Sequence, residues 1–256
     1  MSKTPLKKEF WGKRNYSLLK TVLSLLLLSA TLISLMVGRF EVPPFDIISA
    51  ILSGFIPSPD LSPTVRSVIV DVRLPRVIAV ILVGAALSVA GAAFQGLFRN
   101  PLVSPDILGV SAGAGFGAAL AFLLTENIFI TQSFAFLFGL ISVGLAYMIS
   151  RVYRVSSTLT LVLAGIVVAA LFQALTSLVK YVADPLNKLP AIVFWLMGSF
   201  NHISNSDLMV AGPLLVGGIV ILYLVRWRIN VLSMGEEDAR ALGVDVRQQK
   251  AIIIMS

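Results

Sequence analysis

The sequence predicts an all-α protein that crosses a membrane several times. Hydrophobic residues make up 57% of the 256 residues and charged residues only 13%, whereas soluble domains carry about 25% charged residues. The apolar residues are gathered into long runs, and about 20 of them in a row suffice for a helix to cross a bilayer. Cysteine is absent and histidine occurs once, which excludes disulfides, thiolate metal sites and cysteine nucleophiles.

Six apolar segments are long enough to be complete spans. None of them carries a run of charges, so a helix in each satisfies its backbone groups without placing an ion in lipid. The first segment lacks a small-residue cleavage site followed by a soluble domain, which predicts a retained helix and not a signal peptide. The segments are 17–37, 75–97, 107–124, 132–150, 158–181 and 207–227, and residues 251–255 begin a seventh.

The distribution of Lys and Arg predicts the orientation in the membrane. With the N-terminus in the cytosol, 14 of the 20 basic residues fall in cytosolic segments, as the positive-inside rule requires. We therefore expect a basic cytosolic N-terminus over residues 1–16 and a single transmembrane domain over residues 17–256, located in the cell membrane. Because topology accounts for the net charge of +7, nucleic acid is not an expected partner.

The segment between the first two spans, residues 38–74, contains five prolines and is expected to lie along the outer surface instead of forming one helix. Pro75 is expected to start the second span, since proline suits the first helical turn. Arg73 and Arg76 flank this helix start, where the dipole prefers anions. Two interpretations stay open: both guanidinium groups extend to lipid headgroups, or they bind carboxylates of a docking protein.

A proline- and glycine-rich segment, residues 98–117, follows the second span. Pro101, next to Asn100, interrupts the helix, and Asp106 is placed to cap the next one. The glycines from Gly109 onward could suggest a phosphate loop, but no Lys-Ser or Lys-Thr pair follows and no strand precedes them. Close helix packing is therefore favoured. The chain contains no Walker motif, so any ATP hydrolysis that drives transport belongs to another subunit.

Polar residues occur in the outer half of the fifth predicted span. Gln173, Thr176 and Ser177 stand among apolar residues of this segment. Hydrogen bonds to a neighbouring helix are one explanation of such residues. The lining of a water-filled path is the other explanation, and the sequence does not separate the two.

A charged segment, residues 234–246, lies between the sixth span and the start of the seventh. Gly235 opens it, acids including Glu236 and Glu237 fill the first turn, and Arg240 follows. This charge order suits a short helix, whose N-terminus is partly positive and whose C-terminus is partly negative. Gly243 suits a left-handed C-cap. We expect a short solvated helix that a soluble partner binds, the alternative being a loop helix with no partner.

Enzymatic function is not expected, because no span pairs a histidine with an acid and the only histidine, His202, falls in an outer loop. No metal site or cofactor is expected either. An ion-coupled secondary transporter would need Asp or Glu near the centres of its spans, and spans two to six have none there. Such a transporter and a non-transporting membrane scaffold are kept as alternatives.

Several motifs together resemble one family of membrane proteins. They are RLPR at Arg73–Arg76, GAALSVAGAAFQGLFRNPLVSPDILGVSAGAG from Gly84, LAGI from Leu163, FWLMGSF from Phe194 and GEEDARALGV from Gly235. Their order and sequence are similar to those of FecCD-type permease subunits of ABC importers. The family carries iron–siderophores, haem and cobalamin. Its permeases continue beyond the point where this sequence stops, so the resemblance implies that the C-terminal spans are missing here.

The resemblance implies a type II ABC importer permease fold and a set of partners. These are a second permease copy, identical or different, a cytosolic ATP-binding subunit, an extracytoplasmic substrate-binding protein and the lipid bilayer. Arg73 and Arg76 match the positions that dock the binding protein, and the helix at about 234–245 matches the coupling helix that contacts the ATPase. The implied coupling residues are Gly235, Glu236, Glu237, Ala239, Arg240, Leu242 and Gly243, and the implied gate or path residues are Asn100, Pro101, Gly109, Gly165, Gln173 and Ser177.

Overall fold

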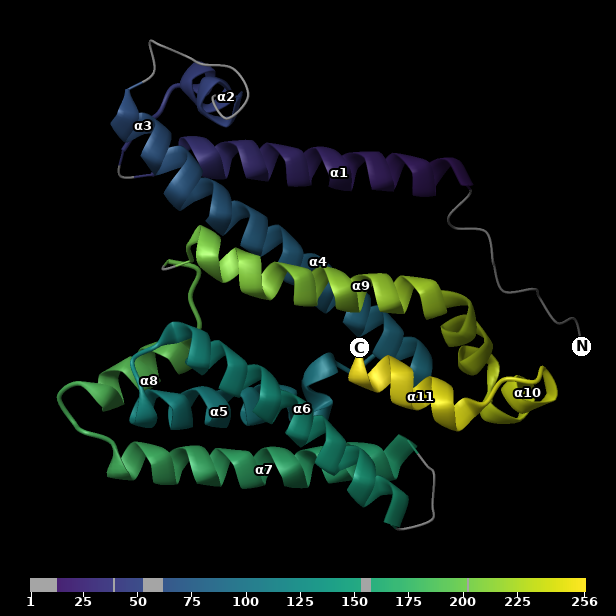
Figure 1. Ribbon diagram of the computed structural model, residues 1–256. Coiled ribbons are helices and arrows are strands. Elements are labelled where there is room, and N and C mark those ends of the chain that lie inside the picture. The colour runs from purple at the N-terminus through teal and green to yellow at the C-terminus, as the bar shows by residue number, and fades with distance from the viewer. Residues whose placement is uncertain (1–12, 39, 53–61, 153–157, 202) are drawn as a thin grey trace, which may run out of the picture. The chain divides into compact units, whose positions relative to one another are not determined.

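The computed structural model describes residues 13–38, 40–52, 62–152, 158–201 and 203–256. Throughout these ranges the secondary structure is helical, which confirms the predicted fold class (Figure 1). The helices are α1 (Lys13–Met36), α2 (Pro44–Leu52), α3 (Pro63–Ser67), a π-helical turn (Val68–Arg73), α4 (Leu74–Phe98), a 3₁₀ turn (Pro105–Leu108), α5 (Val110–Leu124), α6 (Ile128–Val152), α7 (Thr158–Val182), α8 (Lys188–Met197), α9 (Asn205–Met234), α10 (Glu236–Ala241) and α11 (Val246–Met255).

The chain divides into two compact units. The first comprises Met1–Ile81 with Ile203–Met209, and the second comprises Leu82–His202 with Val210–Ser256. Each unit has an apolar core of its own. The single domain predicted for residues 17–256 stays a prediction. Residues 1–12 of the predicted basic N-terminus and His202 fall outside the described residues, whereas residues 13–16 belong to α1.

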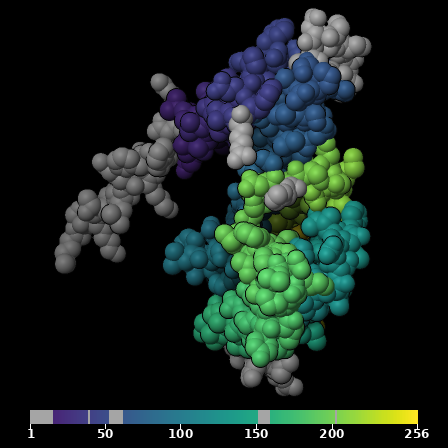
Figure 2. Space-filling view, turned by 90° about the vertical axis from the view of Figure 1, so that its left-hand side faces the viewer, coloured from purple at the N-terminus to yellow at the C-terminus, as the bar shows by residue number. Residues whose placement is uncertain are grey.

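The first unit is organised around the C-terminal end of α1. Its core joins Leu35 of α1, Ile47 of α2 and Ile69 of the π-helical turn. In the space-filling view of Figure 2, the purple residues of α1 lie against the darker blue residues of α2. The short helices of segment 38–74 therefore pack on the end of the first predicted span, as expected for a proline-rich segment that cannot form one helix.

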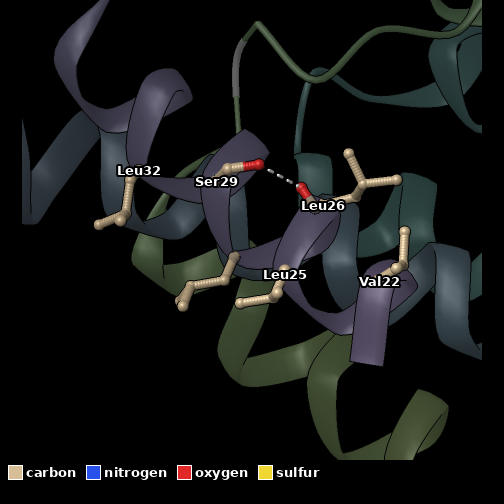
Figure 3. Close-up of a pocket in the computed structure, with 6 residues that line it drawn as sticks. Val22, Leu25, Leu26, Ser29 and Leu32 are labelled. Atoms are coloured by element: carbon tan, nitrogen blue, oxygen red, sulfur yellow. Dashed lines mark hydrogen bonds between the residues drawn. The ribbon is translucent and has the colours of Figure 1, made fainter. Parts of the chain in front are cut away.

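Most of α1 is exposed and apolar. Only 6% of its most apolar window is buried inside the protein. A shallow hollow on this face is lined by four leucines, Val22 and one polar side chain, Ser29. The Ser29 hydroxyl donates to the Leu26 carbonyl at 2.9 Å (Figure 3). Because that hydroxyl is satisfied within its own helix, the face suits lipid.

The second span begins earlier than predicted, and Pro75 does not start it. A continuous helical segment runs from Pro63 to Phe98, and it is Pro63 that occupies the first turn. Proline inside a helix removes one backbone hydrogen bond and crowds the preceding turn. The π-helical turn directly before Pro75 widens the helix at this point, with the Leu74 amide donating to the Ile69 carbonyl. This wide turn accommodates the proline without breaking the helix.

The third predicted span, residues 107–124, is shorter than expected. Residues Pro105–Leu108 form the 3₁₀ turn, Gly109 adopts a left-handed conformation at φ 77°, and α5 contains only 15 residues. Fifteen residues rise about 22 Å, less than the roughly 30 Å of the hydrocarbon core. The other five predicted spans each contain a described helix long and apolar enough to cross a membrane. The helix at the start of the predicted seventh span, α11, begins at Val246, five residues before the predicted start.

Helices α5, α6 and α7 pack side by side in the second unit (Figure 1). Glycines of α5 allow this approach, since a Cβ added at Gly113 would lie 2.5 Å from the Phe138 carbonyl oxygen of α6. One phenylalanine from each helix joins the contact: the rings of Phe116 and Phe138 are 5.0 Å apart, and Phe172 lies 5.6 Å from Phe116. Helix packing is thus confirmed as the role of the glycine-rich start of α5.

Candidate coupling helix and gate turn

The segment at residues 234–246 folds as its sequence predicts. Helix α10 spans six residues, with Glu236, Glu237 and Asp238 in its first turn and Arg240 in its last. Gly243 is left-handed at φ 76°. Its amide donates to the Arg240 carbonyl at 3.0 Å, and the Val244 amide donates to the Ala239 carbonyl at 2.9 Å. This pair of bonds is a Schellman motif, so the predicted C-cap is confirmed.

One side of α10 is held by the rest of the second unit. Ala239 is completely buried and belongs to the same apolar cluster as Leu232 of α9 and Ile253 of α11. Glu236 accepts from Lys250 of α11 at 2.5 Å and from Arg240 at 3.2 Å. In Figure 1, α10 lies between the end of α9 and α11. The short helix is therefore seated on its neighbours and is not a free loop.

The opposite side of α10 is exposed. Glu237, Asp238 and Arg240 are exposed, and Leu242, which follows the helix, is 58% exposed. Gly235 stands apart from the other predicted coupling residues, because it is buried and adopts φ 149°, a conformation that side chains rarely tolerate. The helix therefore presents two acids, one base and a leucine, a mixture of charge and apolar surface that a protein groove can bind.

Arg99 lies near this helix, and its sequence context predicts no role for it beyond membrane topology. It follows α4 and has φ 51°, the one positive φ of a non-glycine residue in the described ranges. One of its guanidinium nitrogens lies 3.6 Å from the point where a Cβ on Gly235 would sit. The turn after α4 therefore reaches the base of α10. No local sequence signal marks this proximity, because the two residues are far apart in the chain.

Four of the predicted gate residues fall into two groups, an exposed pair on the turn after α4 and a buried pair of glycines. Asn100 and Pro101 are exposed, and the Asn100 side chain accepts from the Leu102 amide at 2.9 Å, which fixes the turn. Gly109 and Gly165 are buried. A Cβ on Gly165 of α7 would lie 2.8 Å from Cα of Leu108 and closer still to the carbonyl oxygen of Ile107. The 3₁₀ turn thus lies directly against α7.

Ser142 of α6 holds the same turn from the other side, and sequence reasoning missed it. Its buried hydroxyl donates to the Gly109 carbonyl at 2.8 Å. A single serine in an apolar helix usually bonds to its own backbone, so nothing in the sequence distinguishes this one. The turn is therefore clamped between Ser142 of α6 and Gly165 of α7.

The hydroxyls of Thr176 and Ser177 in α7 bond within their own helix. The Thr176 hydroxyl donates to the Phe172 carbonyl at 2.8 Å, and the Ser177 hydroxyl donates to the Gln173 carbonyl at 3.0 Å. Thr176 is buried, whereas Gln173 and Ser177 are exposed one turn apart on the same face of the helix. The structure thus brings Gly109 and Gly165 together but places Gln173 and Ser177 on a separate, exposed face.

Arg73 occupies a place that neither sequence-based interpretation describes. It is only 9% exposed, and its guanidinium donates to the Leu35 carbonyl at 2.6 Å, to the Met36 carbonyl at 3.1 Å and to the Phe40 carbonyl. These carbonyls lie at and just after the C-terminus of α1, where a cation is favoured. Arg76 is partly buried three residues further on. A docking role for the two arginines stays a prediction.

Among the described residues, no group of three or more Asp, Glu or His side chains could hold a metal ion. The candidate site consists of α10, which is held on one side and is exposed and charged on the other, and of the turn Pro105–Leu108, which lies against α7. The five described helices that are long and apolar enough to cross a membrane define the class of multi-pass membrane proteins.

Comparison with known proteins gives the family. A family model described as the FecCD transport family matches residues 25–256, and the chain belongs to this family. It is 39% identical over 234 residues to the molybdate import system permease protein MolB of Haemophilus influenzae, covering 91% of this chain and 68% of that protein. It is 36% identical over 217 residues to the cobalamin import system permease protein BtuC of Halobacterium salinarum, covering 80% and 58%.

A third relative, from Helicobacter pylori, is a permease protein assigned to iron chelatin transport, 40% identical over 191 residues. The match covers 75% of this chain and 57% of the relative. A solved structure described as an inward-facing conformation of a transporter assigned to the metal-chelate ABC type is also similar. It has a TM-score of 0.79 and 35% identity, covering 94% of this chain and 72% of that one. The chain thus spans between 57% and 68% of the length of these three relatives.

Proposed function

We propose that this chain is the permease subunit of an ABC importer, or the larger part of one, and that it moves a metal chelate into the cytosol. A separate ATP-binding subunit supplies the energy. The observation that carries the proposal is the geometry of α10, which is capped at Gly243, seated through Ala239 and exposed at Glu237 and Asp238. A helix held on one side and exposed on the other is suited to transmit the motion of a bound protein to the helices behind it.

In the proposed mechanism, ATP binding closes two ATPase subunits beneath a pair of permeases. Each ATPase moves the α10 that it binds. Because α9 and α11 pack with α10 in one apolar cluster, they move with it as rigid bodies and switch the path between two packings. The turn at Pro105–Leu108, in contact with α6 and α7, is proposed as part of the gate, and Gln173 and Ser177 as part of the path surface.

The orientation follows from the proposal. The ATPase face, with α10, lies in the cytosol together with the N-terminus. An extracytoplasmic binding protein delivers the cargo at the opposite face, where Arg76 is the more accessible candidate for docking, since Arg73 is bound to α1. A second permease copy completes the path.

The cargo class is inferred from the relatives. They are named for iron chelatin, cobalamin and molybdate, which are bulky metal complexes or a metal oxyanion. We propose an iron–siderophore-type chelate, with haem and cobalamin as alternatives in the same class. An ion-coupled mechanism is disfavoured, because α4, α5, α6 and α7 contain no Asp or Glu to bind a coupling ion.

The test is co-purification and uptake with the full-length permease and its cognate P-loop ATPase. Replacing both Glu237 and Asp238 with Lys reverses the charge of the exposed face, and loss of ATPase co-purification and of ATP-driven uptake is expected. The control is Glu126→Lys, an exposed acid between α5 and α6, which should change neither. Undiminished association in the double variant would refute the assignment of α10. Uptake assays with iron–siderophore, haem, cobalamin and molybdate then identify the cargo.

A further inference from the structure

The three acids at the start of α10 differ in what they contact. Glu237 and Asp238 are exposed, whereas the Glu236 side chain is 28% exposed and binds two cations. Sequence reasoning treats the three as one acidic face. The structure separates them into one carboxylate that faces the protein and two that face away from it.

The two cations bound by Glu236 are not equivalent. Arg240 lies one turn along the same helix at 3.2 Å and is 61% exposed, so this pair resembles an ordinary surface pair of small effect. Lys250 belongs to α11, lies at 2.5 Å and is 18% exposed. Water screens this second pair less, because both side chains are largely buried. The pair with Lys250 is therefore the one that connects two helices.

Apolar contacts beneath the ion pair connect the same helices. Ala239 is fully buried, and Val246 and Ile253 of α11 belong to its cluster. A helix of six residues has too few backbone bonds to be stable alone. Its position consequently depends on these apolar contacts and on the pair between Glu236 and Lys250.

We propose that Glu236 is a positioning residue that fastens α10 to α11 through Lys250, and that the partner protein contacts Glu237, Asp238 and Leu242 instead. This assignment rests on the proposed coupling function. The α10–α11 pair then moves as one rigid lever, so that a displacement of α10 by its partner reaches α11 undiminished. Without the pair, α10 moves locally and the displacement is lost.

The first experiment measures the attachment of α10 without any partner. The 256 residues contain no cysteine, and Ala241→Cys provides one exposed site in α10 for a nitroxide spin label, any cysteine of the remaining full-length permease being replaced by serine. In the full-length permease in liposomes, Glu236→Gln and Lys250→Met should each raise the mobile fraction of the label about two- to fivefold, as expected for losing a partly exposed ion pair. The matched control Glu237→Gln, and the conservative Lys250→Arg, should leave it unchanged.

The double variant Glu236→Gln with Lys250→Met decides whether the two residues act as a pair. A mobile fraction no larger than in either single variant supports the pair, because the second change then removes nothing further. Additive increases would overturn the proposal, as would a Glu236→Gln label no more mobile than in Glu237→Gln.

The second experiment measures coupling in the complete transporter. Glu236→Gln should lower the cargo moved per ATP hydrolysed while ATPase co-purification persists, and Glu237→Gln should instead weaken co-purification. If Glu236→Gln weakens co-purification as much as Glu237→Gln, Glu236 is a contact residue and the positioning role is wrong. If neither the wild-type permease nor any variant binds the ATPase, the proposed coupling function of α10 is wrong. The spin-label experiment still tests the pair between Glu236 and Lys250 in that case.

Discussion

Substitution of Gly165 by alanine tests the packing that clamps the turn Pro105–Leu108. The added methyl group would lie 2.8 Å from Cα of Leu108 and 3.1 Å from the carbonyl carbon of Ile107, and closer still to the oxygen of that carbonyl. These are backbone atoms, so no side chain can rotate away. Since ordinary carbon contacts begin near 3.4 Å, α7 and the turn must separate by at least about 0.6 Å to relieve the contact with Cα.

Overpacking of this kind costs about 1–3 kcal/mol, which corresponds to a fall in melting temperature of about 2–12 °C for a chain of this size. The assay is thermal unfolding of the full-length permease in detergent, followed by tryptophan fluorescence. The matched control is Gly144→Ala in α6, where a Cβ would meet no atom within 4 Å. Alanine there should stabilise the helix slightly, because alanine is the better helix former.

The result that would refute this reasoning is a Gly165→Ala protein that melts at the same temperature as Gly144→Ala. It would mean that α7 and the turn do not approach as closely as described. A second readout connects the packing to transport. If the turn is part of the gate, Gly165→Ala should reduce uptake in membranes at temperatures well below its melting point, whereas Gly144→Ala should not.

Three further predictions follow from the described contacts. Arg73→Gln should lower the free energy of unfolding by about 2 kcal/mol, because it removes charged hydrogen bonds to the end of α1. The control is Arg247→Gln at an exposed position, and equal melting temperatures of the two variants would contradict the capping role of Arg73. Gly243→Ala should lower the free energy of unfolding by about 1 kcal/mol, because the residue at this position has φ 76°. Thermal unfolding measures the effect, and an unchanged melting temperature would count against the left-handed cap. Leu242→Cys should react with a membrane-impermeant maleimide only from the cytosolic side, whereas cysteine at the fully buried Ala239 should react from neither side. Labelling of Leu242→Cys on intact cells would contradict the proposed cytosolic location of α10.

Local patterns predicted much of the fold. The long apolar runs located five spans, because the hydrophobicity that places a helix in lipid is a property of the segment itself. The ends of α10 were equally predictable, since acids in the first turn and Gly243 after the last act through the backbone of their own helix.

Contacts between distant segments were not predictable in this way. The sequence places Arg73 beside the start of its own helix, where a cation is unfavourable, but its partners are carbonyls near residue 36 in another helix. Ser142 and Lys250 carried no local signal, because their partners lie 33 and 14 residues away. The prediction that Pro75 starts a helix is wrong for a related reason. The π-helical turn ahead of it accommodates the proline inside a longer helix, and nothing in the local sequence marks that turn.

The continuous segment from Pro63 to Phe98 contains 36 residues, which rise about 54 Å. The hydrocarbon layer is only about 30 Å thick, so a large part of this rod overhangs the lipid. The charged residues Arg66, Asp71 and Arg73 all fall in its first third, which is the part that the headgroups and water can accommodate. The short helix α2, whose core residues pack with Ile69, therefore adjoins the charged end of this segment and not its long apolar part.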